Sequence, residues 1–137
     1  MADESHELAL IEATLLITGE SFDPRAFEQV IPLHPSEITI RGEPRPSGRG
    51  VYPFSTWSYT IGKRSDTTDV VVAELLDDIW SVRHKLRDFF QVHEGSRQIV
   101  CTVTITDERP LFEFAPETLR RITMLDSSLL VDVYDYS

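Results

Sequence analysis

The sequence of 137 residues is poor in cysteine, in basic residues and in long hydrophobic runs. Its one cysteine, Cys101, cannot form an internal disulfide, and alone it cannot build a cysteine-based zinc site. No stretch approaches the roughly 18 apolar residues of a membrane-spanning helix. The acidic start from Met1 to Glu7 is unlike a secretory signal, which begins with basic residues. These absences predict a cytoplasmic protein that does not enter a membrane.

Acidic side chains outnumber basic ones by 23 to 13, which gives a formal net charge of −10. Nucleic-acid binding requires cationic side chains that displace phosphate counterions, so this balance disfavours it. Five of the basic residues lie within residues 41–64, which also include the segment richest in proline and glycine. Because domains commonly contain about 100–200 residues, we expect a single domain over residues 1–137.

Two hydrophobic periods alternate along the chain. A period of two predicts half-buried strands, which we place at residues 8–18, 36–41, 54–61, 97–106, 111–114 and 129–134. A continuous apolar stripe at three- and four-residue spacing predicts one long helix over about residues 68–93. Shorter helices are predicted at 24–30, where Asp23 is the cap and Pro24 the first helical residue, and at 116–124.

These elements follow the order β-α-β-β-α-β-β-α-β. Half-buried strands are typical of a sheet with helices on one face only. We therefore predict an α+β fold with a mainly antiparallel or mixed sheet of about six strands. The long helix would pack on one face together with the two short helices.

Several short motifs occur in a fixed order along the chain. They are Phe22-Asp23-Pro24, Leu33-His34-Pro35-Ser36, Arg41-Gly42-Glu43, Trp57 and the closing Leu130-Val131-Asp132-Val133-Tyr134. The series resembles the bacterial family known as domain of unknown function 4279. Ser36 stands where threonine is more usual, and Leu125-Asp126-Ser127 lacks an expected glycine. The resemblance implies the architecture and supplies no activity.

The motifs of common enzymes and metal sites do not occur. The sequence has no HExxH pair, no Gly-x-Ser-x-Gly nucleophile motif and no phosphate-binding or dinucleotide-binding glycine pattern. Cys101 alternates with Ile99 and Val103, so we expect it in the core. His84 and Asp88 lie four residues apart, but two ligands rarely hold a metal. We therefore predict a protein that is not an enzyme and has no metal or cofactor.

Our leading hypothesis is a non-enzymatic protein-interaction module, in its most specific form an immunity-type inhibitor of a basic toxin. An acidic surface accelerates association with a basic partner by electrostatic steering. The predicted acidic contact surface consists of Asp66, Asp69, Glu74, Asp77 and Asp78.

The alternative is a module that binds a small molecule or a peptide through an arginine and aromatic loop over residues 41–59. Arginine with aromatic side chains is a common composition of binding surfaces. Its predicted residues are Arg41, Arg45, Arg49, Trp57 and Tyr59. A third possibility, an unrecognised hydrolase or transferase, would require a deep pocket that gathers residues such as His34 and Asp132. The sequence does not predict the oligomeric state.

Overall fold

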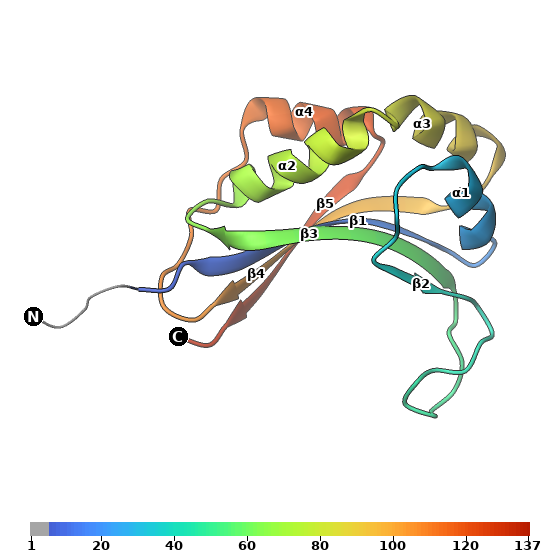
Figure 1. The fold of residues 1–137 in the computed structure, drawn as a ribbon, viewed down its shortest axis with the longest axis horizontal. Coiled ribbons are helices and arrows are strands. Elements are labelled where there is room, and N and C mark those ends of the chain that lie inside the picture. Colours follow the sequence, from blue (N-terminus) through green and yellow to red (C-terminus); the bar gives the residue numbers. More distant parts are fainter. Residues whose placement is uncertain (1–5) are drawn as a thin grey trace, which may run out of the picture.

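In a computed structural model, residues 6–137 are described and form one mixed sheet of five strands, with four helices packed on it (Figure 1). The strands are β1 (Ala9–Gly19), β2 (Glu37–Thr39), β3 (Ser55–Ser65), β4 (Ser96–Ile105) and β5 (Ser128–Asp135). The helices are α1 (Pro24–Val30), α2 (Thr68–Trp80), α3 (Arg83–Val92) and α4 (Pro116–Met124). This arrangement confirms the predicted α+β class.

The strands are arranged in the order β2-β3-β1-β4-β5. All neighbours are antiparallel except β4 and β5, which are parallel because α4 carries the chain back between them. β1 is the central strand, and its Leu15 pairs with Tyr59 on one side and with Ile99 on the other. Paired residues lie on the same face of a sheet. The odd-numbered residues of β1 and β4 are mostly buried and face the helices, and the even-numbered residues face the opposite side.

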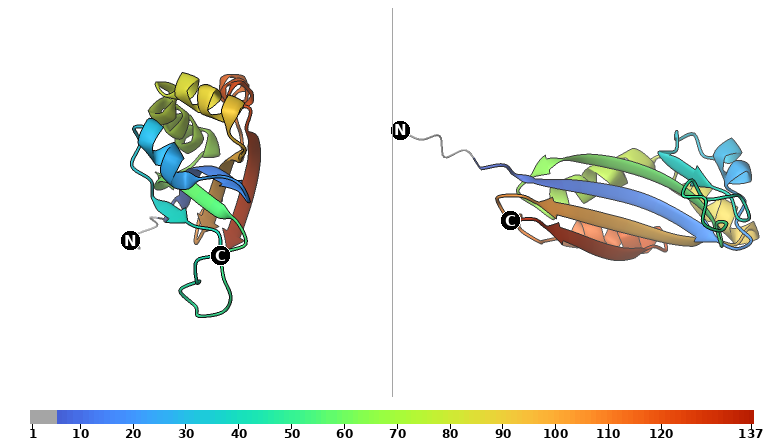
Figure 2. Two further views of the ribbon diagram at one scale, coloured as in Figure 1. Left: turned by 90° about the vertical axis from the view of Figure 1, so that its right-hand side faces the viewer. Right: turned by 90° about the horizontal axis from the view of Figure 1, so that it is seen from below.

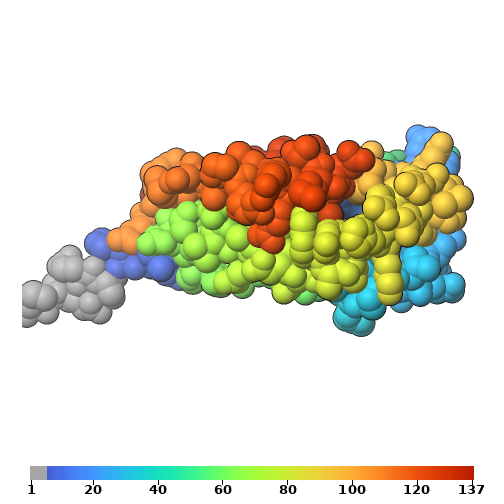
Figure 3. Space-filling view, turned by 90° about the horizontal axis from the view of Figure 1, so that it is seen from above, coloured from blue at the N-terminus to red at the C-terminus, as the bar shows by residue number. Residues whose placement is uncertain are grey.

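The core lies between the sheet and the helices. The buried odd-numbered side chains of β1 and β4 pack against apolar residues of α2 such as Leu75 and Ile79. At one end, Phe27 of α1 contacts Trp57 of β3 and Phe89 of α3, with ring centroids 4.8 Å and 5.1 Å away. Viewed from above, α2 and α4 lie side by side over the sheet (Figure 3).

The prediction of one long helix over residues 68–93 is wrong, because the chain forms α2 and α3 instead. At the junction, the amide of Val82 donates to the carbonyl oxygen of Ile79 at 3.1 Å, which is a tighter turn than in an α-helix. After the turn, Leu86 and Phe89 are buried, and Phe89 packs against Phe27 of α1. No glycine or proline marks this turn, and the apolar spacing continues through it.

The predicted strand at residues 111–114 is also wrong, so the described sheet has five strands and not six. Leu111 forms only an isolated bridge with Thr67. The Thr68 hydroxyl donates to the carbonyl oxygen of Glu113 at 2.8 Å, so the segment is held by the start of α2. Leu111 and Phe112 are exposed, as expected for a segment without a sheet partner.

The face of the sheet opposite the helices is open. Viewed from below, no helix of the described chain covers it (Figure 2). A loop over residues 41–53 projects below one end of the sheet (Figure 1), and residues 41–50 are all exposed. The loop is closed by a bridge between Pro44 and Val51 and by a hydrogen bond from the Gly42 amide to the Tyr52 carbonyl oxygen. Within residues 6–137, no helix is both long enough and apolar enough to span a membrane.

Candidate functional site

The arginine and aromatic residues predicted to form a binding loop do not come together. Trp57 has 0% of its surface exposed and belongs to the core. Tyr59 also faces the helices, and its hydroxyl donates to Oδ2 of Asp78 on α2 at 3.0 Å. Partial burial and this hydrogen bond raise the pKa of Tyr59 above its ordinary value, so the phenol remains a donor. Arg41, Arg45 and Arg49 are exposed on the 41–53 loop.

A shallow pocket forms instead where this loop meets the open face. It has a volume of about 400 Å³, and its lining includes Arg45, Tyr52 and Phe54. The Arg45 guanidinium lies 5.8 Å from the centroid of the Tyr52 ring, and its Nε donates to the carbonyl oxygen of Val51 at 3.3 Å. Phe54 was not among the predicted residues. The alternation of β3, extended back to residue 54, places Phe54 on the face of the sheet opposite to that of Trp57. Arg41 and Arg49 do not line the pocket.

The predicted acidic contact surface is largely occupied by contacts within the chain. Glu74 forms an ion pair with Lys63, and Asp78 accepts the hydrogen bond from Tyr59. Asp77 lies 2.8 Å from a guanidinium nitrogen of Arg121. Within the described residues, Asp66 is the one member without a side-chain hydrogen bond or ion pair.

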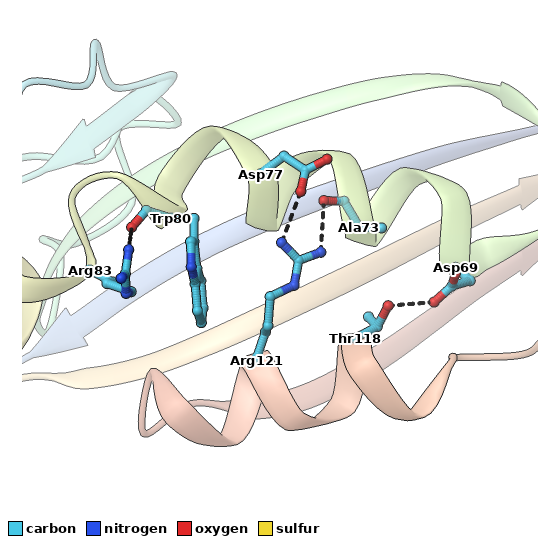
Figure 4. A network of polar contacts seen from close by, with 7 residues as sticks. All are labelled: Asp69, Ala73, Asp77, Trp80, Arg83, Thr118 and Arg121. Atoms are coloured by element: carbon cyan, nitrogen blue, oxygen red, sulfur yellow. Dashed lines mark hydrogen bonds and ion pairs between the residues drawn. The ribbon is translucent and has the colours of Figure 1, made fainter.

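Asp69 points toward α4 and not toward solvent (Figure 4). Its Oδ1 accepts hydrogen bonds from the amide of Ala115 at 2.9 Å and from the hydroxyl of Thr118 at 2.7 Å. Ala115 is the N-cap residue of α4 and has no side chain that could cap the helix. Asp69 therefore accepts from the N-cap amide of α4, which is the role that the side chain at the third helical position has in a capping box.

A second set of contacts joins the same two helices (Figure 4). The Trp80 ring has the guanidinium of Arg83 at 4.8 Å and that of Arg121 at 5.5 Å from its centroid. Arg121 has 13% of its side chain exposed and also donates to the carbonyl oxygen of Ala73 at 3.4 Å. Asp69 and Arg121 therefore hold α4 against α2, and Arg83 of α3 contacts Trp80 of α2; all three have structural roles.

Groups with catalytic potential lie apart from one another. Cys101 is fully buried in the core, as predicted, and burial raises the pKa of its thiol to about 11. His6, His34, His84 and His93 are all exposed. Among the described residues, no three His, Cys, Asp or Glu side chains form a group that could hold a metal ion. Asp132 is exposed on the open face, where it accepts a hydrogen bond from the Tyr134 hydroxyl at 3.0 Å.

The open face of the sheet has no helix of the described chain packed on it. It is formed by the even-numbered residues of β1, β3, β4 and β5. Neutral side chains dominate it, including apolar Leu16 and Val100 and hydroxyl pairs such as Thr14 with Thr60 at 2.8 Å. Such a flat and partly apolar surface suits a macromolecular partner better than a small substrate, which requires a concave site.

Comparison with known proteins identifies the family but no function. No curated protein and no solved structure matches the chain. The family model described as domain of unknown function (DUF4279) matches residues 7–136, which is nearly the whole chain. The order of short motifs along the sequence and the match of the family model agree, and the chain belongs to the DUF4279 family.

Proposed function

We propose that this chain is a non-enzymatic protein-interaction module that binds a basic protein, in the specific form of an immunity-type inhibitor of a basic toxin. The observation that carries the proposal is the open sheet face, which no helix of the described chain covers. The apolar side chains of this face, Leu10, Leu16, Val100, Leu130 and Tyr134, lie among hydroxyl-bearing neighbours, and a partly apolar sheet face can be buried against another layer. A protein partner can supply that layer.

Charge supports a basic partner. The chain has a net charge of −10, and the open face carries Glu12 and Asp132 together with Arg64, which is ion-paired with Glu7. Complementary charge accelerates encounter and disfavours acidic competitors. An inhibitor of this kind acts by covering the partner, so it requires no catalytic group of its own.

The test is a pull-down with the tagged full chain from the native cells at low salt, repeated at high salt, with mass spectrometry of the captured proteins. A specific basic partner should be released by salt and should be lost when Val100→Arg places a positive charge at the centre of the open face. Thr123→Arg adds the same charge on the exposed outer side of α4 and should leave capture unchanged. Expression of the partner alone should be toxic, and co-expression of this chain should relieve the toxicity. Equal capture by both variants contradicts binding through the open face.

A second candidate function is binding of an anionic small molecule or peptide at the pocket under the 41–53 loop. The position of Arg45 beside Tyr52 and Phe54 favours it. A ligand that binds only the folded state raises its melting temperature. Thermal shift with a panel of anionic metabolites and peptides, compared between the natural chain and Arg45→Gln, separates this function from the first.

A further inference from the structure

β5 is an edge strand whose outer side has no partner within the described chain. Directly after it, the amide of Tyr136 donates to the carbonyl oxygen of Ile105 on β4 at 2.8 Å. Main-chain groups of a strand point alternately to its two sides. The N–H and C=O groups of Val131 and Val133 therefore point away from β4, and they are free to pair with another strand.

Side chains on both faces of β5 are exposed and apolar. Val131 and Val133, on the helix side, have 38% and 42% of their surfaces exposed. Leu130 and Tyr134, on the open face, are each 46% exposed. Edge strands are usually protected from pairing by short length, proline or charge. β5 has eight residues and no proline, so the charge of Asp132 is its main protection.

The charges on β5 select the kind of strand that could be added. Asp135 is paired with Arg109 at 2.8 Å, whereas among residues 6–137 the Asp132 carboxylate has only the Tyr134 hydroxyl as a partner. Like charges on directly opposed strand residues are destabilising, and opposite charges are favourable. The net charge of −10 also repels a second copy of the chain. A cationic strand is repelled neither by Asp132 nor by the net negative charge of the chain.

We propose that the outer edge of β5 binds an extended, basic segment of a protein partner as a sixth strand, with a Lys or Arg side chain beside Asp132. The main-chain groups of Val131 and Val133 supply the hydrogen bonds. The exposed apolar side chains of β5 supply the buried area, as in other cases of strand addition. This inference rests on the proposed function, because it specifies how the basic partner is held.

The experiment uses the isotope-labelled full chain and a synthetic nine-residue peptide of alternating valine and lysine. A peptide with glutamate in place of every lysine is the control. The lysine peptide should bind, and the binding should protect the amides of Val131 and Val133 from hydrogen exchange. Its affinity should fall as salt is added, and the glutamate peptide should not bind.

Two substitutions test the two parts of the site. Val131→Pro removes an outward N–H but no hydrogen bond to β4, and proline is tolerated on the outer side of an edge strand. It should weaken peptide binding at least tenfold, whereas Val131→Thr, which keeps the N–H, should bind as the natural chain does. Asp132→Asn keeps the shape of the side chain and should weaken binding several-fold. If Val131→Pro does not fold, Asp132→Asn and the exchange map decide the outcome.

Four results would overturn the proposal: no binding of the lysine peptide, protection of amides elsewhere, equal binding of both peptides, or a dimer paired through β5 in sedimentation analysis. The pull-down separates this inference from the function on which it rests. If the natural chain and the folded Val131→Pro variant capture the same basic protein equally, the edge inference fails and the function stands. If no protein is captured but the lysine peptide protects β5, the proposed function fails and the edge site stands.

Discussion

Cys101 lies on the helix side of β4 between Ile99 and Val103, and all three side chains are fully buried. Burial raises the pKa of its thiol from 9.0 to about 11. The fraction of thiolate in the folded chain at pH 8 is therefore about 100-fold lower than in the unfolded chain. We expect Cys101 to react with a disulfide reagent at least 100-fold more slowly in the native chain than in denaturing urea. Equally fast labelling in the two states would show that the thiol is accessible.

The same shift has a consequence for stability. The pKa of Cys101 is higher in the folded state, so its contribution to stability is complete below pH 9 and is lost as the pH rises toward 11. Urea unfolding of the natural chain and of Cys101→Ala at several pH values measures this. Across this interval the free energy of unfolding of the natural chain should fall relative to that of Cys101→Ala.

At the scale of elements, Asp69 joins α2 to α4. Asp69→Ala leaves the amide of Ala115 and the buried hydroxyl of Thr118 without their acceptor. An unsatisfied buried polar group costs about 1–3 kcal/mol, so we expect a loss of about 2–4 kcal/mol in the free energy of unfolding by urea. The exposed Asp66, three residues earlier, is the matched control, and Asp66→Ala should change stability by less than about 0.5 kcal/mol. Equal effects would contradict the bridging role of Asp69.

Elements with a local signal were predicted well. The alternation of β1 and β4 and the capped start of α1 were predicted within about two residues, because those patterns depend on neighbours in the sequence. The Asp23 side chain accepts hydrogen bonds from the amides of Arg25 and Ala26, as a cap residue does. The break between α2 and α3 brings Phe89 against Phe27 of α1, a contact between distant residues that the spacing around Ser81 does not encode.

The candidate site was harder to predict because it depends on which face of the sheet the helices cover. Alternation places Trp57 and Tyr59 on one face of β3, but it does not say whether that face is open. The helices cover it, so these aromatic residues are separated from Arg45 on the other side. Alternation places Asp132 on the same face as Leu130 and Tyr134, but it does not show that β5 is an edge strand, which depends on the strand order.

At the scale of the whole molecule, charge repulsion opposes association of the exposed edges. The isoelectric point of the sequence is about 4.7, where the net charge of −10 at neutral pH vanishes. We expect light scattering to reveal association of folded chains near pH 4.7 but not at pH 7.5, because an unpaired apolar edge then meets no repulsion. Val131→Pro should reduce this association and Val131→Thr should not. Equal scattering by both variants would place the contact elsewhere.

The central position of β1 affects how the chain emerges from the ribosome. β1 is made before both of its neighbours, and its Ala13 pairs with Ile61 and with Cys101, which follow 48 and 88 residues later. At a synthesis rate of about 5–20 residues per second, roughly 4–18 s pass before the second neighbour exists. During that time the apolar strand β1 lacks β4, one of the two strands with which it pairs. We therefore expect the nascent chain to bind ribosome-associated chaperones more strongly than the small size of the finished domain suggests.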